Sequence, residues 1–308
     1  MNNSPCFFST IIPCYNSNIV WLLHSINSVI DSLEKSEASG EIILVDDGSE
    51  VSIEASIRDR IQPTNIPIFF IRKMNGGLSS ARNTGISHAN GSYCHFLDDD
   101  DTISKDFYTY MANAISTSDS ELLYCDSEFF DDHHRLPFDS TTEQQFIAKM
   151  ICGNCVHVNA VVCKTDWLQE VNGFDESLPA LEDWDIWIRM LRSQHRFEHL
   201  PIQLASVRLH QNSMSRDRRA MYSCMAQISI REMAEHSSFW ITHLQTRKQI
   251  NAWIKTAFTY SYRSKTPYKN VISCLRRSVH LDGTMSAIFF FIRQGVVALL
   301  TQENSPHQ

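Results

Sequence analysis

The stretch "HFLDDDD", residues 95–101, places four carboxylates in a row directly after a short apolar run. Each ionised carboxylate raises the cost of ionising its neighbours, so such a row needs either a bound cation or full exposure to water. Mg²⁺ and Mn²⁺ take one or two carboxylates from a protein and complete their coordination with water and phosphate oxygens. The row therefore indicates either a metal and phosphate site or a solvated loop, and taken alone it favours the loop.

Further polar clusters also follow apolar runs that are typical of buried strands. We expect strands at residues 7–12, 41–46, 66–72 and 92–97. Helical patterns lie between and after them, at residues 22–33, 78–89 and 103–115. This alternation predicts a mainly parallel α/β sheet flanked by helices. Ligands of such sheets collect at the carboxyl ends of the strands, so "PCYN", "DDGS" and "DDDD" should meet at one edge.

The later part of the chain carries weaker patterns. We expect a loop over 131–142, a helix over 142–151, a strand over 157–164, a turn over 172–178 and a short helix over 181–194. From about Arg219 onward the pattern is helical and amphipathic. We therefore expect an α/β domain over residues 1–218 and a helical C-terminal region over 219–308.

The charge of the chain is unevenly distributed. The formal net charge of -8 argues against general nucleic-acid binding. Residues 241–300, however, carry nine basic side chains and one acid, Asp282. The apolar segment at 286–300 contains Arg293 and Gln294 and is shorter than the roughly 18 to 20 residues of a membrane span. This region either lies on an anionic membrane surface or packs on the acidic domain.

The cysteines and the N-terminal residues indicate a reducing compartment. The nine cysteines are odd in number and scattered among apolar neighbours, as in proteins with free thiols. Cys152 and Cys155 form a CxxC without a second pair at zinc-finger spacing. The first residues lack a secretory signal, so we expect a cytoplasmic protein, peripheral on the inner face of the cell membrane if the C-terminal region binds lipid.

Six motifs in order, "STIIPCYN", "ILVDDGS", "NGGLSSARNTGI", "HFLDDDD", "GFDESLPALEDWDIWIRM" and "VRLHQNSMS", resemble the inverting glycosyltransferases of family 2. These enzymes have the GT-A nucleotide-sugar fold. The resemblance covers roughly residues 7–216 and not the C-terminal helical region. It implies an enzyme that moves a sugar from a nucleotide donor to a hydroxyl group, with Mn²⁺ or Mg²⁺ as cofactor.

The resemblance implies a nucleotide-binding set at the first two strand ends. Pro13 and Tyr15 match a shelf on which the base stacks, although Tyr15 is alternatively an ordinary core aromatic. Asp47 matches the residue that accepts a hydrogen bond from uracil, and Asp46 lies near the ribose. The alternative for both acids is a simple Asp-Gly turn.

The same resemblance implies that Arg82 and Asn83 line the nucleotide pocket. Arg82 is alternatively a structural ion-pair partner of the acidic row. Asp98 and Asp99 belong to the expected nucleotide-sugar contacts as well, Asp98 through the ribose or a metal-bound water.

The family's D-x-D metal motif maps onto Asp98 and Asp100. Asp100 is the expected direct ligand, and His210 matches a histidine that reaches the metal or the diphosphate. Asp101 either shares this site or caps the following helix. Ser213 and Ser215 match a loop that closes over the donor.

Asp183 matches the family's catalytic base, and Glu182 is expected to hydrogen-bond the acceptor or orient that base. The alternative is that both acids only favour a helix N-terminus. Trp184 or Trp187 is a candidate for stacking on a sugar ring, although their helical spacing favours the core for at least one of them.

We therefore expect an inverting, metal-dependent glycosyltransferase that uses a nucleotide sugar, with a UDP-sugar as the first candidate. The expected acceptor is a saccharide, lipid-linked as in bacterial surface-polysaccharide or lipopolysaccharide assembly. One alternative is a sugar nucleotidyltransferase, but "IIPCYNSN" lacks the glycine-rich loop and basic residue that it would need. The other is an inactive GT-A scaffold or binding protein.

Overall fold

The structure is a computed structural model that describes residues 7–36, 38–118, 120–131, 135–138, 143–193, 196–210, 217–236 and 239–240. The chain divides into two compact units. The first contains residues 1–146 and 154–216, and the second contains 147–153 and 217–308. The assignment of catalysis to the first region and membrane contact to the second remains a prediction.

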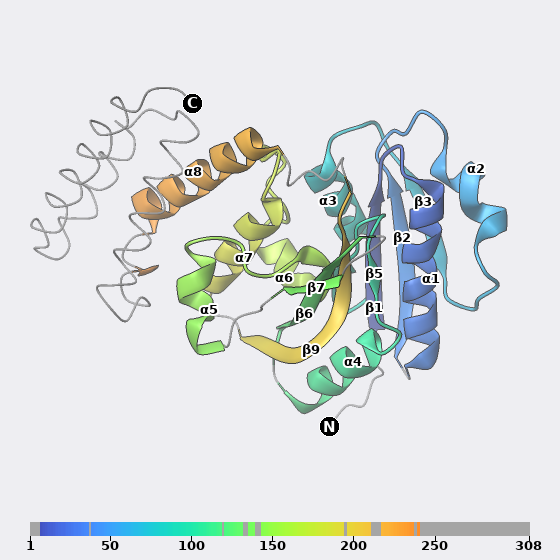
Figure 1. The fold of residues 1–308 in the computed structure, drawn as a ribbon, viewed down its shortest axis with the longest axis horizontal. Coiled ribbons are helices and arrows are strands. Elements are labelled where there is room, and N and C mark those ends of the chain that lie inside the picture. Colours follow the sequence, from blue (N-terminus) through green and yellow to red (C-terminus); the bar gives the residue numbers. More distant parts are fainter. Residues whose placement is uncertain are drawn as a thin grey trace, which may run out of the picture. The chain divides into compact units, whose positions relative to one another are not determined.

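The first unit is built on a sheet of nine strands in the order β3-β2-β1-β4-β8-β6-β9-β5, with β7 paired to β6 (Figure 1). Its N-terminal half is parallel and comprises β1 (Phe7–Cys14), β2 (Ser39–Asp46), β3 (Ile68–Arg72) and β4 (Tyr93–Phe96). β1 and β2 are buried along almost their whole length, as expected for a parallel sheet that helices cover on both faces.

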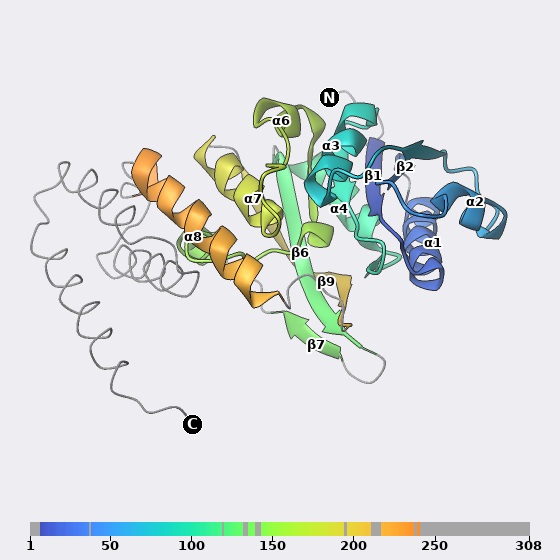
Figure 2. The ribbon, with the colours of Figure 1, turned by 90° about the horizontal axis from the view of Figure 1, so that it is seen from above.

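Helices α1 (Ile19–Lys35) and α3 (Leu78–His88) lie on opposite faces of this parallel half (Figure 2). α1 begins at Asn18, whose side chain accepts hydrogen bonds from the backbone N–H groups of Val20 and Trp21. Its buried stripe includes Leu22, Ile26 and Val29. Short helical turns, α2 (Ile53–Ile57) and η1 (Arg58–Arg60), connect β2 to β3.

The second half of the sheet is mixed. It comprises β5 (Thr102–Ile103), β6 (Leu122–Phe130), β7 (Arg135–Phe138), β8 (Val161–Lys164) and β9 (Phe197–Arg208). β8 is antiparallel to both β4 and β6, whereas β9 is parallel to β6. The carboxyl end of β9 and the amino end of β8 therefore lie at the same sheet edge as the carboxyl ends of β1 to β4.

The remaining helices follow the strands. They are α4 (Phe107–Thr117), α5 (Glu143–Met150), η2 (Val158–Ala160), α6 (Thr165–Glu170), α7 (Glu182–Arg192) and α8 (Arg218–Glu235). α8 belongs to the second unit, where the indole of Trp240 donates a hydrogen bond of 2.9 Å to the buried carboxylate of Glu232. None of the described helices is long and apolar enough to cross a membrane.

The prediction of a mainly parallel α/β sheet flanked by helices is confirmed. The predicted loop over 131–142 is wrong in part, because Arg135–Phe138 pairs with β6 as β7. β6 and β9 had no predicted counterpart. Their outer segments are only half-buried, so they lack the continuous apolar pattern of β1 and β2.

Gly85 sets the distance between α3 and β1. A Cβ atom at this position would lie 2.3 Å from Cγ2 of Ile11 and 3.0 Å from its Cγ1. Alanine in a helix interior ordinarily stabilises by up to about 1 kcal/mol relative to glycine. Here we expect Gly85→Ala to lower the free energy of unfolding by about 1–3 kcal/mol through overpacking, measured by urea denaturation.

Ser87→Ala is the control, because Ser87 is exposed on the same helix. We expect its effect to stay within about 0.5 kcal/mol. A Gly85→Ala protein that is more stable than the wild type would contradict the close packing of α3 on β1.

Candidate active site

Polar side chains from several elements meet at the carboxyl edge of the sheet. Tyr15 follows β1, Asp47 follows β2, the acidic row follows β4, and His210 follows β9. The amino end of α7 reaches the same place, because Arg82 of α3 contacts it. The predicted convergence of polar clusters at one edge is therefore present in the geometry.

Arg82 joins the acidic row to α7. Its guanidinium is 1% exposed and donates from Nη2 to Asp98 Oδ1 at 2.7 Å and from Nη1 to Glu182 Oε1 at 2.5 Å. The ring of Phe174 lies 5.3 Å from the guanidinium carbon. These neighbouring carboxylates raise the pKa of Arg82 even though burial opposes its charge. The ion pair of Arg82 with the acidic row is thus present, and contact of Arg82 with a nucleotide remains a prediction.

The pKa values of Asp99 and Asp100 are raised in the crowded acidic row. Burial, together with the charges of Asp100 and Asp98, raises the pKa of Asp99 to about 7. Burial and the charge of Asp98 also raise the pKa of Asp100, whose Oδ2 lies 2.6 Å from Nε2 of His210. A cation at this place would stabilise the ionised form of both groups.

Asp101 has a different role from its neighbours. Its carboxylate is 4% exposed and accepts hydrogen bonds from the backbone N–H of Arg208 at 2.7 Å and from Nδ2 of Asn159 at 3.0 Å. The following helix begins instead at Asp106. The expectation that Asp101 caps that helix is therefore wrong: this carboxylate fastens the end of β9 to the acidic row.

His210 is held from both sides. Its ring centroid lies 5.1 Å from that of Trp21 on α1, and its Nε2 contacts Asp100. The side chain of Arg208 donates to the backbone oxygen of Asp100 at 3.0 Å. Asp100 and His210, far apart in sequence, thus form one cluster.

Glu182 and Asp183 occupy the first turn of α7. Leu181, which precedes them, has a left-handed backbone with φ of 61°. A branched residue held there stores backbone strain of the kind found at functional sites. Glu182 is 5% exposed and bound to Arg82.

Asp183 is partly buried, and its carboxylate accepts hydrogen bonds from the backbone N–H of Trp184 and from Nδ2 of Asn154, both at 2.7 Å. Burial is the largest cause that raises the pKa of Asp183 to about 7, followed by the charge of Glu182, while Arg82 opposes the shift. A carboxylate that changes protonation near neutral pH is suited to general base chemistry.

The acids of "DDGS" both take part in turn structure. Asp46 accepts from the backbone N–H groups of Ser49 at 2.8 Å and Ile53 at 3.2 Å. Asp47 accepts from Lys73 Nζ at 2.6 Å and from the backbone N–H of Gly77 at 2.8 Å. Contact of these acids with ribose or uracil remains a prediction.

The other predicted nucleotide contacts differ in exposure. Tyr15 is 56% exposed, which excludes the core alternative and leaves its ring free for stacking. Pro13 is buried in β1, opposite Val45. Asn83 donates to the backbone oxygen of Phe174 at 2.9 Å and accepts from its N–H at 2.8 Å, so it braces the segment before α7.

Trp184 and Trp187 are 0% and 1% exposed, so both belong to the core and neither is available to a sugar ring in this structure. Ser213, Ser215, His133 and His134 lie outside the described residues. Of the two cysteines of the CxxC, Cys152 is partly exposed and Cys155 is buried.

The side chains at the site are of the types that could coordinate a divalent cation together with a phosphate ligand. Within the described residues, no group of three or more His, Cys, Asp or Glu side chains is arranged to hold a metal ion on its own. Asp100, Asp98 and His210 nevertheless offer hard oxygen and imidazole donors, and burial destabilises the bare negative charge of Asp100. Phosphate oxygens would have to complete such a site.

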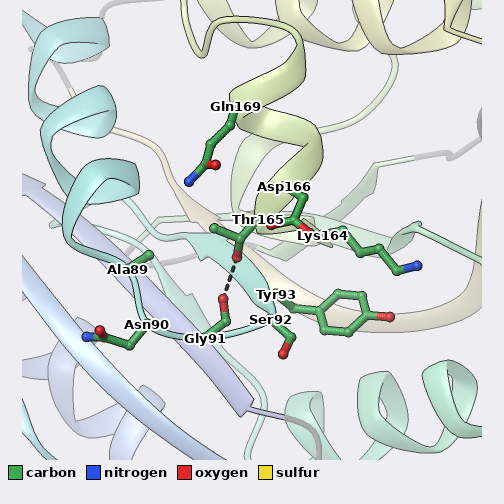
Figure 3. Close-up of a pocket in the computed structure, with 9 residues that line it drawn as sticks. All are labelled: Ala89, Asn90, Gly91, Ser92, Tyr93, Lys164, Thr165, Asp166 and Gln169. Atoms are coloured by element: carbon green, nitrogen blue, oxygen red, sulfur yellow. Dashed lines mark hydrogen bonds between the residues drawn. The ribbon is translucent and has the colours of Figure 1, made fainter.

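A pocket of about 400 Å³ lies elsewhere, between the start of β4 and the start of α6 (Figure 3). It is lined by residues that include Gly91, Ser92 and Lys164, and Thr165 donates to the backbone oxygen of Gly91 at 2.6 Å. β4 runs from this pocket toward Asp98. The pocket is therefore at the opposite edge of the sheet from the acidic row.

Comparison with known proteins decides the family. The family model described as "Glycosyl transferase family 2" matches residues 9–166, just over half of the chain. The chain belongs to this family. The matched span includes the "DDGS", "ARN" and "DDDD" segments, whereas Glu182, Asp183 and His210 lie beyond it.

Two of the relatives that match this chain are much longer than it. An uncharacterized glycosyltransferase of Rickettsia bellii is 26% identical over 305 residues, covering 91% of this chain and 41% of that protein. The minor teichoic acid biosynthesis protein GgaB of Bacillus subtilis is 35% identical over 115 residues, or 37% of this chain and 13% of that protein. The chain thus spans less than half the length of these two relatives.

Solved structures share the fold of this family 2 member. The structure of S. aureus TarS residues 1–349 in complex with UDP-GlcNAc has a TM-score of 0.59 at 16% identity, covering 89% of this chain and 88% of that chain. The same fragment in complex with UDP has a TM-score of 0.57. At this level of identity the likeness establishes the fold, and with it the GT-A architecture.

Three contacts of the site had no counterpart in the sequence analysis: those of Asn154 with Asp183, Asn159 with Asp101, and Lys73 with Asp47. Asn154 and Asn159 both precede β8, which runs antiparallel to β4 and so begins at the site edge. The sequence carries no local signal for the reversed direction of β8, so the contacts of Asn154 and Asn159 could not be predicted from it.

We expect Arg82→Met to lower the free energy of unfolding by about 3–5 kcal/mol, because it leaves the buried Glu182 carboxylate without its counter-charge. The measurement is urea denaturation at neutral pH. Arg58→Met is the control: its ion pair with Glu54 is exposed, so the loss should stay below about 1 kcal/mol. Equal losses in both variants would contradict the bridging role of Arg82.

Proposed function

We propose that this chain is an inverting glycosyltransferase that moves a sugar from a UDP-sugar to a hydroxyl group of a saccharide acceptor. The observation that carries the proposal is the pair of contacts from Arg82 to Asp98 and Glu182. Through them the acidic row, which suits a diphosphate with a cation, is joined to the first turn of α7. There Asp183, a carboxylate suited to deprotonating an alcohol, follows Glu182. The family 2 match and the UDP-GlcNAc complex of TarS support a nucleotide-sugar donor.

In this proposal the nucleotide lies across the carboxyl ends of β1 and β2. The exposed ring of Tyr15 stacks on the base, next to Pro13. Asp46 and Asp47 reach the ribose and the uracil, and Arg82, Asn83, Asp98 and Asp99 complete the binding set. The hydrogen bonds that Asp47 accepts from Lys73 and Gly77 hold its carboxylate in one orientation for this contact.

Asp183 is the proposed base, and Glu182, the residue before it on α7, hydrogen-bonds the acceptor or orients that base. Asp183 accepts the proton of the acceptor hydroxyl while the acceptor oxygen forms a bond to the anomeric carbon. The bond between that carbon and the diphosphate oxygen breaks on the opposite face, and its electron pair leaves with the nucleoside diphosphate. One displacement of this kind inverts the configuration of the anomeric carbon.

Asp100, with Asp98 and His210, is the proposed holder of Mn²⁺ or Mg²⁺. The ion would neutralise negative charge on the leaving diphosphate. Arg208 and Asp101 support this cluster by fixing the end of β9 against the acidic row.

The acceptor part of the proposal rests on the relatives and on charge. GgaB is described as a teichoic acid biosynthesis protein, which supports a surface glycan as the acceptor class. The basic excess over residues 241–300 supports a lipid-linked acceptor at an anionic membrane surface. That segment lies outside the described residues, so membrane contact stays a proposal from sequence.

The alternative function is a catalytically inactive scaffold. Such a protein would bind a UDP-sugar but would neither hydrolyse it nor transfer its sugar. We expect wild-type protein to hydrolyse or transfer a UDP-sugar and Asp183→Asn to lose about 10²–10⁴-fold in kcat. Because the deprotonated form acts as base, kcat/KM of the wild type should rise with pH through the pKa of Asp183, about 7.

Thermal shift with UDP-sugar provides the control, since Asp183→Asn should still bind the donor. A wild-type protein that turns over no member of a UDP-sugar panel, or an Asp183→Asn protein with full activity, would contradict the proposed function.

We expect Mn²⁺ to raise the melting temperature more in the presence of UDP than in its absence, because phosphate oxygens complete the metal site. Asp100→Asn should remove most of this increment. Asp106→Asn is the control, since Asp106 is an acid paired with Lys35 and is not among the proposed ligands. An unchanged increment in Asp100→Asn would remove Asp100 from the metal site.

A further inference from the structure

Asn154 contacts the side chain of the proposed base from a distant segment. It lies between α5 and η2, and its Nδ2 donates a hydrogen bond of 2.7 Å to Oδ2 of Asp183, 29 residues later in the chain. The other carboxylate oxygen, Oδ1, accepts from the backbone N–H of Trp184. Within the described part of the chain these are the two donors on Asp183.

The orientation of the Asn154 amide is fixed by a second contact. Its Oδ1 accepts a hydrogen bond of 3.2 Å from the backbone N–H of Val156. An N–H can only donate, so the oxygen must face Val156 and the NH₂ group must face Asp183. Asn154 is therefore a donor to Asp183 and cannot turn to present its oxygen without losing both contacts.

Among the described residues, the charged groups around Asp183 do not hold its carboxylate by a hydrogen bond, whereas the neutral amide of Asn154 does. Glu182 raises the pKa of Asp183, and Arg82 lowers it. Both terminal nitrogens of Arg82 already bind other carboxylates, those of Asp98 and Glu182. The contact between Trp184 and Asp183 joins adjacent residues of one helix. Asn154 is thus the donor that ties the carboxylate to another part of the fold.

We propose that Asn154 is a positioning residue for Asp183: its amide holds the carboxylate in one rotamer and stabilises the ionised form that accepts the proton of the incoming hydroxyl. The inference rests on the proposed function of Asp183. It adds a residue from the amino side of β8, which none of the six motifs contains. Each carboxylate oxygen of Asp183 accepts a single hydrogen bond from the described residues. Each therefore keeps one lone pair for the hydroxyl group of the acceptor substrate.

Asn154→Asp is the sharpest test, because the two side chains have the same shape. The variant keeps an oxygen for the N–H of Val156 but replaces the donor to Asp183 with a second acid. We expect the acidic limb of kcat/KM to move up by about one pH unit or more, the size of one charge-assisted hydrogen bond. We expect kcat/KM at pH 7 to fall at least about tenfold, with the KM for the UDP-sugar nearly unchanged. Asn154→Ala, which removes the donor without adding an acid, should shift the limb in the same direction by less.

Asn90→Asp is the matched control. Asn90 also donates to a carboxylate, that of the buried Glu41, with 3.1 Å between Nδ2 and Oε2, but at the opposite edge of the sheet. This variant should lower the melting temperature and leave the acidic limb where it is in the wild type. A shift of the limb in Asn90→Asp as large as in Asn154→Asp would overturn the proposal, since it would make the shift a general effect of added acid.

The titration of the Asp183 carboxyl carbon by NMR, assigned with Asp183→Asn, gives a readout that needs no turnover. An upward shift of this titration in both Asn154 variants supports the proposal. An unmoved titration and an unmoved acidic limb would overturn it even if kcat fell, because Asn154 would then only brace its loop. A wild type without transfer or hydrolysis would instead count against the proposed function, and the carboxyl titration would still test the contact.

Discussion

The buried guanidinium of Arg82 lies between carboxylates from two segments that are far apart in the chain, Asp98 after β4 and Glu182 at the start of α7. A charge at 1% exposure is stable only when it is paired and hydrogen-bonded, and Arg82 satisfies this with both terminal nitrogens. The planar fork of an arginine makes two such contacts at fixed angles, which a lysine could not. This one side chain therefore joins the acidic row to Glu182, the residue before the proposed base.

The four carboxylates of the acidic row have different roles. Asp101 is buried and binds the end of β9, so it contributes to the fold. Asp98 binds Arg82, and Asp100 contacts His210. Asp99 and Asp100 carry raised pKa values because burial and mutual repulsion oppose their charge. The same crowding that is unfavourable in the bare protein would favour a divalent cation, which is the physical basis for proposing one here.

The reversed direction of β8 is the feature that completes the site. A fully parallel sheet would bring only carboxyl ends of strands to this edge. Because β8 runs antiparallel to β4, the segment before it also arrives there and supplies Asn154 to Asp183 and Asn159 to Asp101. The family 2 model ends at residue 166, just after β8, whereas the fold match to TarS covers 89% of this chain.

The sequence by itself determined the parallel half of the sheet and the place of its polar clusters. Strands such as β1 and β2 are continuous apolar runs because helices cover both faces, and their ends are marked by Asp, Asn and Gly, so local pattern is sufficient. A strand over 157–164 was also predicted, and it contains β8. β6, β9 and the antiparallel direction of β8 were not predictable, since half-buried strands mix polar and apolar residues and strand direction leaves no local trace in the sequence. Only the tertiary structure decided that Trp184 and Trp187 are core residues, that Asp101 fastens β9 and that Asn154 contacts Asp183. Each of these depends on which distant backbone lies opposite a side chain, and that is set by the packing of the whole sheet rather than by the spacing of residues along the chain.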